Sequence, residues 1–256
     1  MTDAPFVSGL RIAREDMSLL IRGAAIDVAP HRHHALQIAV GLAGPFRLEQ
    51  GQMSAMFDGA IVAPDAAHRL DSLGQDIGVL LVEPELPAAR EAGLRFLGGR
   101  PVAALPGAET ERLRAICMAG ELPSPVEALA VLVPGAEKRQ ALDPRIAALQ
   151  ERLRALPEKR AVPGEAAAAL GLSESHLRHL FRKETGVSFR RYLLWLRLGD
   201  AMARALSGTP LTEAAHAAGF ADSAHLSRTC REMFGINPLA LARHSRFVQA
   251  PNGAGS

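Results

Sequence analysis

The apolar residues of this chain follow two different spacings, and the first covers the N-terminal third. Between Phe6 and Glu85, short apolar runs alternate with turn residues such as Gly, Pro and Asp, a pattern typical of β-strands. The runs are S-L-L-I-R-G-A-A, A-L-Q-I-A-V-G-L, P-F-R-L, G-A-I-V-A-P and I-G-V-L-L-V-E-P. Their close succession predicts a small antiparallel barrel or sandwich.

After Glu85 the apolar spacing becomes helical. Three segments have apolar residues at helical intervals, with Gly or Pro between them: Leu86–Leu97, Ala108–Gly120 and Val126–Val133. The stretch from Val133 to Gln140 combines Pro and Gly with charged residues and has no apolar periodicity, so we predict a linker there. Asp143 is then a predicted N-cap, with Pro144 at the first helical position. Further predicted N-caps are Ser188, for a long helix through Leu206, and Asp222 or Ser223, and a last helix is predicted to start near Pro238.

The C-terminal part contains an approximate internal repeat. The first copy, A-A-A-A-L-G-L-S-E-S-H-L-R-H-L-F-R-K-E-T-G, runs from Ala166 to Gly186. The second, A-A-H-A-A-G-F-A-D-S-A-H-L-S-R-T-C-R-E-M-F-G, runs from Ala214 to Gly235. Each copy predicts a short Ala-rich helix, a glycine turn and a second helix, which is the pattern of a helix-turn-helix motif.

The second helix of each copy, which we call a reading helix, separates apolar from polar side chains. In the first reading helix Leu177, Leu180 and Phe181 share one face, and in the second Leu226, Cys230 and Phe234 do so. The opposite faces carry hydroxyl, imidazole and guanidinium groups, which can bond base edges and phosphates in a major groove. Candidate DNA-binding residues are Ser175, Arg178, His179, Arg182, Ser223, Ala224, Ser227, Arg228 and Arg231.

Charge is divided unevenly along the chain. Residues 1–136 contain 11 Lys and Arg against 16 Asp and Glu, whereas residues 137–256 contain 18 against 11. The net charge of +2 therefore combines an acidic half with a basic half. This division is typical of a nucleic-acid-binding domain joined to a domain with another task.

The segment from Asp143 to Phe247 resembles the DNA-binding domain of the AraC/XylS family of bacterial transcription regulators. The resemblance rests on Ser173–Gly186, the run R-R-Y-L-L-W-L-R-L-G-D-A-M-A-R-A-L, Leu211–Phe220 and Phe234–Arg243. It implies two helix-turn-helix subdomains, joined by one long helix, that enter successive major grooves of promoter DNA. One departure is Cys230, which stands where the family usually has an inward aromatic residue. The resemblance also implies a homodimer, with Leu113, Ile116 and Cys117 as inward or interface positions, and RNA polymerase as a partner.

A histidine cluster gives the N-terminal part its candidate chemistry. The layout of H-R-H-H-A-L-Q, followed later by A-P-D-A-A-H-R, resembles the cupin-like effector domain often found before this DNA-binding domain. In metal-binding cupins the equivalent positions converge on an ion, and here they are His31, His33, Gln37 and His68. Gln37 replaces the usual carboxylate, so three interpretations stay open: a divalent metal on His31, His33 and His68, an organic-ligand pocket, or a structural role. On one strand His31 and His33 would share a face, and His34 would point away from it, towards the surface or an interface.

We therefore expect an α+β protein. Residues 1–136 would form an antiparallel cupin-like β-barrel with covering helices, which senses a small molecule or metal ion and dimerises. Residues 137–142 would be a linker, 143–248 an all-α tandem helix-turn-helix domain, and 249–256 a flexible tail. The chain has no long apolar run and no secretion signal, and its two cysteines are expected to be reduced thiols. We accordingly expect a cytoplasmic protein without a membrane segment.

The alternative from another class is a metal-dependent cupin enzyme, such as a dioxygenase or isomerase, with an appended helical domain. Gln37 in the carboxylate position argues against it, as does the short second motif from Gly59 to His68. Glu83 is the nearest candidate for a general acid, and nothing in the sequence places it in the barrel. We therefore expect no catalytic residue.

Overall fold

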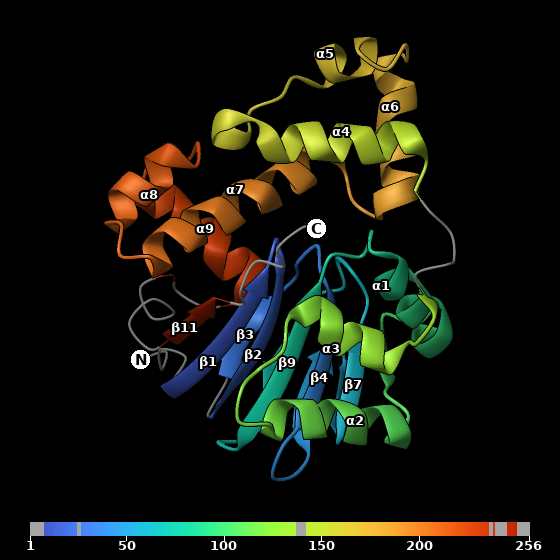
Figure 1. The fold of residues 1–256 in the computed structure, drawn as a ribbon, viewed down its shortest axis with the longest axis vertical. Helices are drawn as coiled ribbons and strands as arrows, with labels where there is room; N and C mark the ends of the chain where they lie inside the picture. The colour runs from blue at the N-terminus through green and yellow to red at the C-terminus, as the bar shows by residue number, and fades with distance from the viewer. Residues whose placement is uncertain (1–7, 25–26, 137–141, 236–237, 239–244, 250–256) are drawn as a thin grey trace, which may run out of the picture.

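In the computed structural model, a β-rich N-terminal part is followed by a helical C-terminal part (Figure 1). The structure describes residues 8–24, 27–136, 142–235, 238 and 245–249. The predicted α+β class is confirmed. Among the described residues, none of the helices is long and apolar enough to cross a membrane.

The β-strands form two sheets. Their bounds are β1 (Ser8–Glu15), β2 (Ser18–Ala24), β3 (Asp27–His31), β4 (Leu36–Gly41), β5 (Phe46–Gln50), β6 (Met53–Phe57), β7 (Gly59–Val62), β8 (His68–Asp71), β9 (Asp76–Val82), β10 (Val102–Ala104) and β11 (Ser245–Gln249). The larger sheet has the order β10-β7-β4-β9-β2-β1-β11, and the smaller one has the order β3-β8-β5-β6. All pairs are antiparallel except β1 with β11, as the alternating runs predict for the N-terminal part.

Alternation along β4 explains how the larger sheet is covered on both faces. Leu36, Ile38 and Val40 belong to the apolar cluster that contains the N-terminal helices, whereas Ala39 belongs to the cluster between the sheets. Because side chains alternate along a strand, Gln37 shares the face of Ala39 and points into the space between the sheets. Burial on both faces also explains why β4 is apolar throughout except at Gln37.

Three helical segments cover the outer face of the larger sheet (Figure 1). They are α1 (Pro87–Ala92), continued by the π-helical turn η1 (Gly93–Leu97), α2 (Gly107–Met118) and α3 (Pro125–Leu132). Each was predicted to within a few residues. Leu113 and Cys117 of α2 are fully buried against the sheet, so the inward interpretation is confirmed for these two positions.

The C-terminal part contains a tandem of helices around one long helix. They are α4 (Pro144–Ala155), η3 (Pro157–Lys159), α5 (Pro163–Ala168), α6 (Glu174–Thr185), α7 (Phe189–Leu206), α8 (Leu211–Ala217) and α9 (Ser223–Phe234). The predicted caps are confirmed: the side chains of Asp143, Ser188 and Asp222 accept hydrogen bonds from the first turns of α4, α7 and α9. Gly186 and Gly235 end the reading helices in the left-handed conformation.

One strand departs from the predicted all-α C-terminal domain. Ser245–Gln249 form β11, which pairs in parallel with β1 from Leu10↔Ser245 to Arg14↔Gln249. The outer edge of β1 offers unpaired backbone groups, and the run R-F-V suits a strand that satisfies them. Gln249, assigned to the tail, is thus the last residue of a strand. The predicted linker residues 137–141, the final helix near Pro238 and residues 250–256 lie largely outside the described residues.

Both thiols should be unreactive in the folded protein. Cys117 and Cys230 are fully buried, and burial raises the pKa of each thiol to about 12. Because the thiolate is the reactive form, labelling with a disulfide reagent at pH 8 should detect neither thiol in the native chain and both after denaturation. A native thiol that reacts at the rate of the denatured chain would contradict this burial.

Candidate functional site

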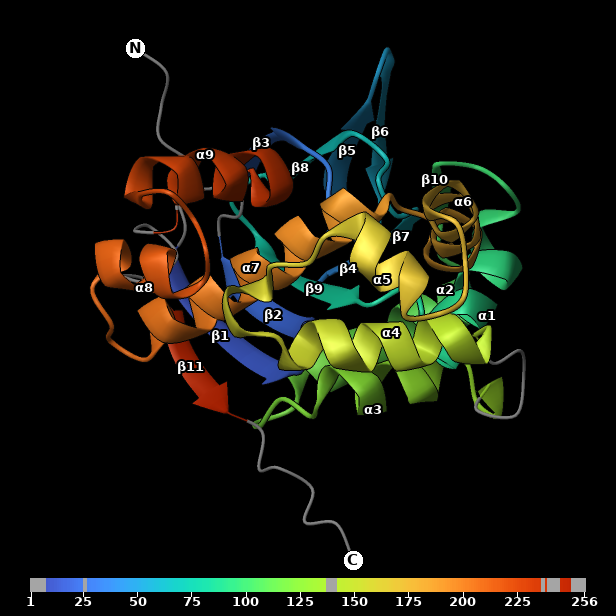
Figure 2. The ribbon, with the colours of Figure 1, turned by 90° about the horizontal axis from the view of Figure 1, so that it is seen from above.

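The two reading helices are α6, which precedes the N-terminal end of α7, and α9, which lies alongside α7 (Figure 1, Figure 2). α6 packs with α5, and α9 packs with α8. The turns that precede them open at Gly171 and Gly219, whose φ angles are +66° and +83°. These left-handed positions suit glycine, which explains the glycine at the same place in both copies. The structure therefore contains the two helix-turn-helix units that the repeat predicts.

The outer face of α6 carries the side chains predicted to contact DNA. Ser175, Arg178, His179 and Arg182 are exposed, whereas Leu177, Leu180 and Phe181 are buried. The guanidinium of Arg178 forms an ion pair with Glu174, one turn earlier on the same helix. A base or phosphate would therefore have to replace this intrahelical partner. The predicted division between an inner and an outer face is confirmed, and DNA contact stays a prediction.

The outer face of α9 has the same division. Ala224, Arg228 and Arg231 are exposed, and Ser223 and Ser227 are half-buried. On the inner face Leu226 and Cys230 are fully buried, and Phe234 is half-buried with its ring 5.5 Å from the ring of Trp195. The small Cys230 thiol thus occupies a core position beside an aromatic pair.

The histidine cluster lies in the space between the two sheets. His31 on β3 is the cross-strand partner of His68 on β8, His33 follows in the loop after β3, and Gln37 reaches in from β4. All four side chains are buried. One metal-ligand atom from each of the three histidines lies within 4.8 Å of the others. The sequence reasoning placed His31 and His33 on one strand; β3 ends at His31, but the two rings still converge, with centroids 5.4 Å apart.

Backbone carbonyl groups fix the tautomer of each ring. The Nδ1 atoms of His31, His33 and His68 lie 2.9–3.0 Å from the carbonyl oxygens of Ala29, Ala35 and Ala66. A carbonyl oxygen can only accept, so each Nδ1 must carry the proton and donate it. In a neutral ring the Nε2 atom then keeps a free lone pair. This is the arrangement in which histidines bind metal ions, with the other ring nitrogen held by a backbone carbonyl.

Burial keeps the three rings neutral. It lowers the pKa of His31 well below its ordinary range, lowers that of His33 to about 4, and lowers that of His68, and the neighbouring imidazoles add to the effect for His31 and His33. The Gln37 side-chain amide lies 3.0 Å from His33 Nε2 and 3.2 Å from His68 Nε2. With its amino group turned to the rings the amide donates to both lone pairs, and with its oxygen turned to them it can share a cation with the imidazoles. Three imidazoles with an amide oxygen are a chemically suitable donor set for a divalent ion.

A second buried network, which the sequence reasoning did not identify, joins the barrel to the C-terminal helices. His34 Nε2 lies 2.6 Å from Glu85 Oε1, and Gln150 of α4 donates to the same oxygen at 3.1 Å. The His34 ring packs against the rings of Tyr192 and Trp195 on α7. His34 is therefore fully buried at a contact within the chain, and a surface position was wrong. The sequence did carry a signal for this network, because Glu83 and Glu85 follow the apolar run of β9.

Glu83 belongs to this contact rather than to the histidine cluster. Its carboxylate lies 2.7 Å from Arg154 Nη2 on α4, and burial raises its pKa. Glu83 was the nearest candidate for a general acid in the barrel. The structure pairs it instead with Arg154 of the C-terminal helices.

The segment that carries His31 and His33 also touches α9 and α7. The backbone N–H groups of Ala29 and Arg32 donate to the carbonyl oxygens of Gly235 and Glu232 at 3.2 and 3.1 Å. Arg191, in the first turn of α7, donates to the carbonyl of Arg32 at 3.0 Å and lies 3.0 Å from Asp65 Oδ1. Ala29 therefore bonds α9 through its N–H and His31 through its carbonyl.

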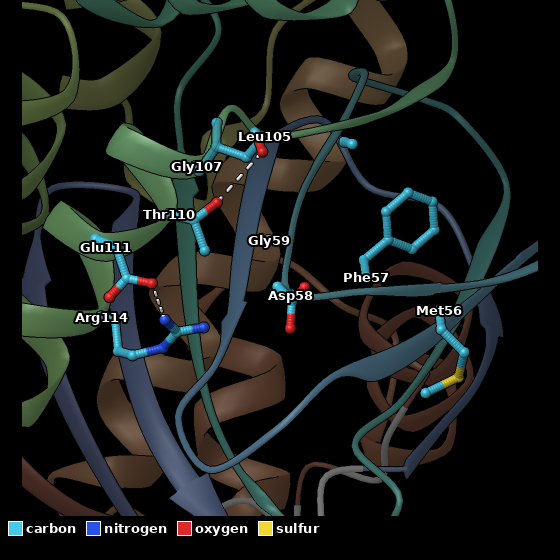
Figure 3. A pocket seen from close by; sticks show the side chains of 10 residues that line it. Met56, Phe57, Asp58, Gly59, Leu105, Gly107, Thr110, Glu111 and Arg114 are labelled. Carbon is cyan, nitrogen blue, oxygen red and sulfur yellow. Dashed lines mark hydrogen bonds and ion pairs between the residues drawn. The ribbon is translucent and has the colours of Figure 1, made fainter.

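Two cavities differ in shape and lining. One of about 590 Å³ opens beside β6, β7 and the start of α2, and Figure 3 shows Asp58, Met56 and Phe57 across from Thr110. Its arginine, Arg114, is already bonded to Glu111 and to the carbonyl of Gly41. The other, of about 60 Å³, lies between β1 and β2 on one side and α7 on the other, with mostly apolar walls.

Comparisons with known proteins agree with this architecture. Residues 166–244 match a family model described as a helix-turn-helix domain. An apo form of a ToxT point variant from Vibrio cholerae strain SCE256 has a similar fold, with a TM-score of 0.61 and 12% identity over 91% of this chain and 99% of that chain. Wild-type ToxT from that strain, bound to an unsaturated fatty acid, gives a TM-score of 0.56 and 12% identity over 95% and 98%.

A transcriptional regulator with an AraC-type DNA-binding domain from Chromobacterium violaceum is 26% identical over 39% of this chain and 90% of its own, with a TM-score of 0.38. A search of curated proteins gives no match. The family match places a helix-turn-helix domain at residues 166–244, and the whole chain shares the two-part fold of ToxT.

Proposed function

We propose that the chain is a one-component transcription regulator that reads promoter DNA with α6 and α9 and senses a divalent metal ion in its barrel. The observation that carries the sensing part is the convergence of three neutral imidazoles with their Nδ1 atoms held by backbone carbonyls. His31, His33 and His68 would hold the ion, and Gln37 Oε1 would be a fourth ligand. A bound divalent cation would supply positive charge that cross-links β3, the following loop, β8 and β4.

The reading faces support sequence-specific recognition. Arg228 and Arg178 are exposed guanidinium groups on the outer faces of α9 and α6, and a guanidinium can bond a guanine through two atoms at once. Ser175, His179, Arg182, Ser223, Ala224, Ser227 and Arg231 complete the proposed DNA contacts. The basic balance of the C-terminal half supports phosphate contacts as well.

The cavity beside β6, β7 and α2, of about 590 Å³, is large enough for an organic effector, because small-molecule sites usually enclose about 300–1,000 Å³. The cavity between the barrel and α7 has only about 60 Å³ in this arrangement of the chain. The walls of that cavity are nevertheless apolar, and ToxT binds an unsaturated fatty acid. An apolar acid between the domains is therefore the second candidate effector, and it would require α7 to move away from β1 and β2.

The connection between Ala29, Arg32 and the end of α9 supports the sensing role. An ion that fixes His31 and His33 would stabilise the segment whose N–H groups bond Gly235 and Glu232. Metal binding would then favour one placement of α9 over others, as an effector must do to change DNA affinity. We further propose that the protein acts in the cytoplasm as a homodimer with RNA polymerase as a partner, and that the barrel has no catalytic role.

The first prediction concerns base reading by α9. A binding site is selected from random double-stranded DNA with the full chain, and affinity is then measured by fluorescence anisotropy. Arg228→Ala should cost about 1–3 kcal/mol on the selected site if the residue reads a base, and much less on random DNA. Arg204→Ala, which removes an exposed arginine paired with Asp200 on α7, is the matched control. Equal losses on both DNAs would make Arg228 a phosphate contact.

The second prediction concerns metal binding. Zinc or nickel titrated into metal-free protein should bind at one ion per chain and raise the thermal midpoint, because binding to the folded state stabilises it. His33→Ala should weaken this binding more than about tenfold, whereas His216→Ala, which removes an exposed histidine on α8, should leave it unchanged. Tight binding that survives His33→Ala would place the ion elsewhere.

The third prediction concerns Gln37. Gln37→Glu keeps the shape of the side chain and replaces a neutral oxygen donor by a carboxylate, which divalent ions bind more strongly. Metal affinity should rise by at least about tenfold, or ~1.4 kcal/mol, while the metal-free protein loses stability because the carboxylate is buried. Unchanged metal affinity would show that Gln37 is not a ligand.

A further inference from the structure

The N-terminal part of the chain contacts both reading helices at their C-terminal ends. At α9 the contact includes the hydrogen bonds from Ala29 and Arg32 to Gly235 and Glu232. At α6, Arg90 of α1 places its Nη2 atom 3.4 Å from the carbonyl oxygen of Glu184 and 3.6 Å from the carboxylate of the same residue. Figure 2 shows α1 beside α6 and β3 beside α9, on either side of α7. One body therefore touches both ends of the tandem.

The contact with α9 is close-packed and apolar. Cys230 and Met233 belong to the same buried cluster as Leu10 and Ile12 of the barrel. A Cβ atom on Gly235 would lie 2.5 Å from the carbonyl oxygen of Ala29, so the two backbones approach as closely as glycine allows. This end of the tandem is fixed to the barrel.

The contact with the first helix-turn-helix unit is of another kind. Its own apolar cluster, which contains Leu177, Phe181 and Ile146, meets the N-terminal part at the partly buried Met17. Beside the packing of the His34 ring on Tyr192, the contacts of the described residues there are polar: Arg90 with Glu184, Glu85 with Gln150, and Glu83 with Arg154. Polar pairs can exchange for water, so this end of the tandem is the adjustable one.

Arg90 makes the polar contact that reaches the reading helix itself. The last carbonyl groups of a helix carry partial negative charge, which a guanidinium stabilises. The Glu184 carboxylate also accepts the N–H of Asp143 at 3.1 Å, at the start of α4. The Arg90 and Glu184 side chains are only 20% and 13% exposed, so solvent screens the pair weakly. One arginine thus joins α1 to the end of α6 and the beginning of α4.

We propose that Arg90 is a specificity-determining residue that sets the spacing between the two DNA half-sites. This inference rests on the proposed function, in which α6 and α9 each read one half-site. An added base pair moves the second half-site by about 3.4 Å and turns it by roughly 34°. A tandem held at both ends accepts one spacing, whereas a tandem released at α6 accepts neighbouring spacings as well.

The test measures spacing preference rather than affinity. The full chain selects a site from random DNA, and versions of that site are made with one base pair inserted or removed between the half-sites. Arg90→Ala should reduce the preference for the selected spacing at least about fivefold. This is the change expected when a coupling free energy of ~1 kcal/mol between α1 and α6 is lost. Arg90→Lys, which keeps a cation near Glu184, should restore part of it. Arg95→Ala is the matched control, because Arg95 pairs with Glu109 inside the N-terminal part.

The outcomes separate this inference from the proposed function. Failure of the wild-type chain to enrich any DNA site would overturn both. An enriched site whose spacing preference is unchanged in Arg90→Ala, or equally weakened in Arg95→Ala, would overturn the inference alone. Relaxed spacing in Arg90→Ala, with unchanged affinity for a single half-site and an unchanged thermal midpoint of the barrel, would support it.

Discussion

The apolar core that the barrel shares with the second helix-turn-helix unit is the interaction on which the arrangement of the chain depends. Leu10, Ile12 and Val28 from the sheets lie in one buried cluster with Trp195 and Met233 from the helices. Apolar burial contributes about 25 cal/mol per Å², so separation of this contact would expose side chains that now have no access to water. β11 adds backbone pairing to the contact between the barrel and the C-terminal part, because it extends the larger sheet beyond β1. The barrel and α7–α9 therefore pack as one body, although a linker separates them in the sequence.

The first helix-turn-helix unit is joined to this body by groups that are costly to bury. Among the described residues, His34 Nδ1, Glu85 Oε2 and Tyr192 OH are buried polar atoms without a hydrogen-bond partner in the protein. Each such atom opposes closure of the contact by about 1–3 kcal/mol unless water reaches it. The ion pairs and hydrogen bonds across the contact offset part of this cost, so this contact contributes less to stability than the apolar core described above.

Local sequence rules predicted the parts of the molecule that local interactions determine. Caps at Asp143, Ser188 and Asp222 follow from side chains that bond the nearest turn, and the inward positions on α6 and α9 follow from helical periodicity. The convergence of His31, His33 and His68 was expected from a resemblance, and the end of β3 at His31, before His33, did not alter it. Periodicity could not predict β11 or the partners of His34, because both depend on residues far away in the sequence.

The position of His33 suggests how the two contacts communicate. His33 belongs to the proposed metal site, and His34, the next residue, bonds Glu85, which also accepts from Gln150 on α4. A single peptide unit therefore joins the proposed site to the adjustable contact, and its two side chains point into different environments. Since the peptide is planar and stiff, a shift of His33 towards an ion must be matched by His34 or by the backbone around it. His34 is packed against Tyr192 and Trp195 and has little room to absorb such a shift. In this arrangement a metal ion would bind in the barrel segment that is fixed to α9. Its effect would reach the adjustable contact with α4 and α6 through His34.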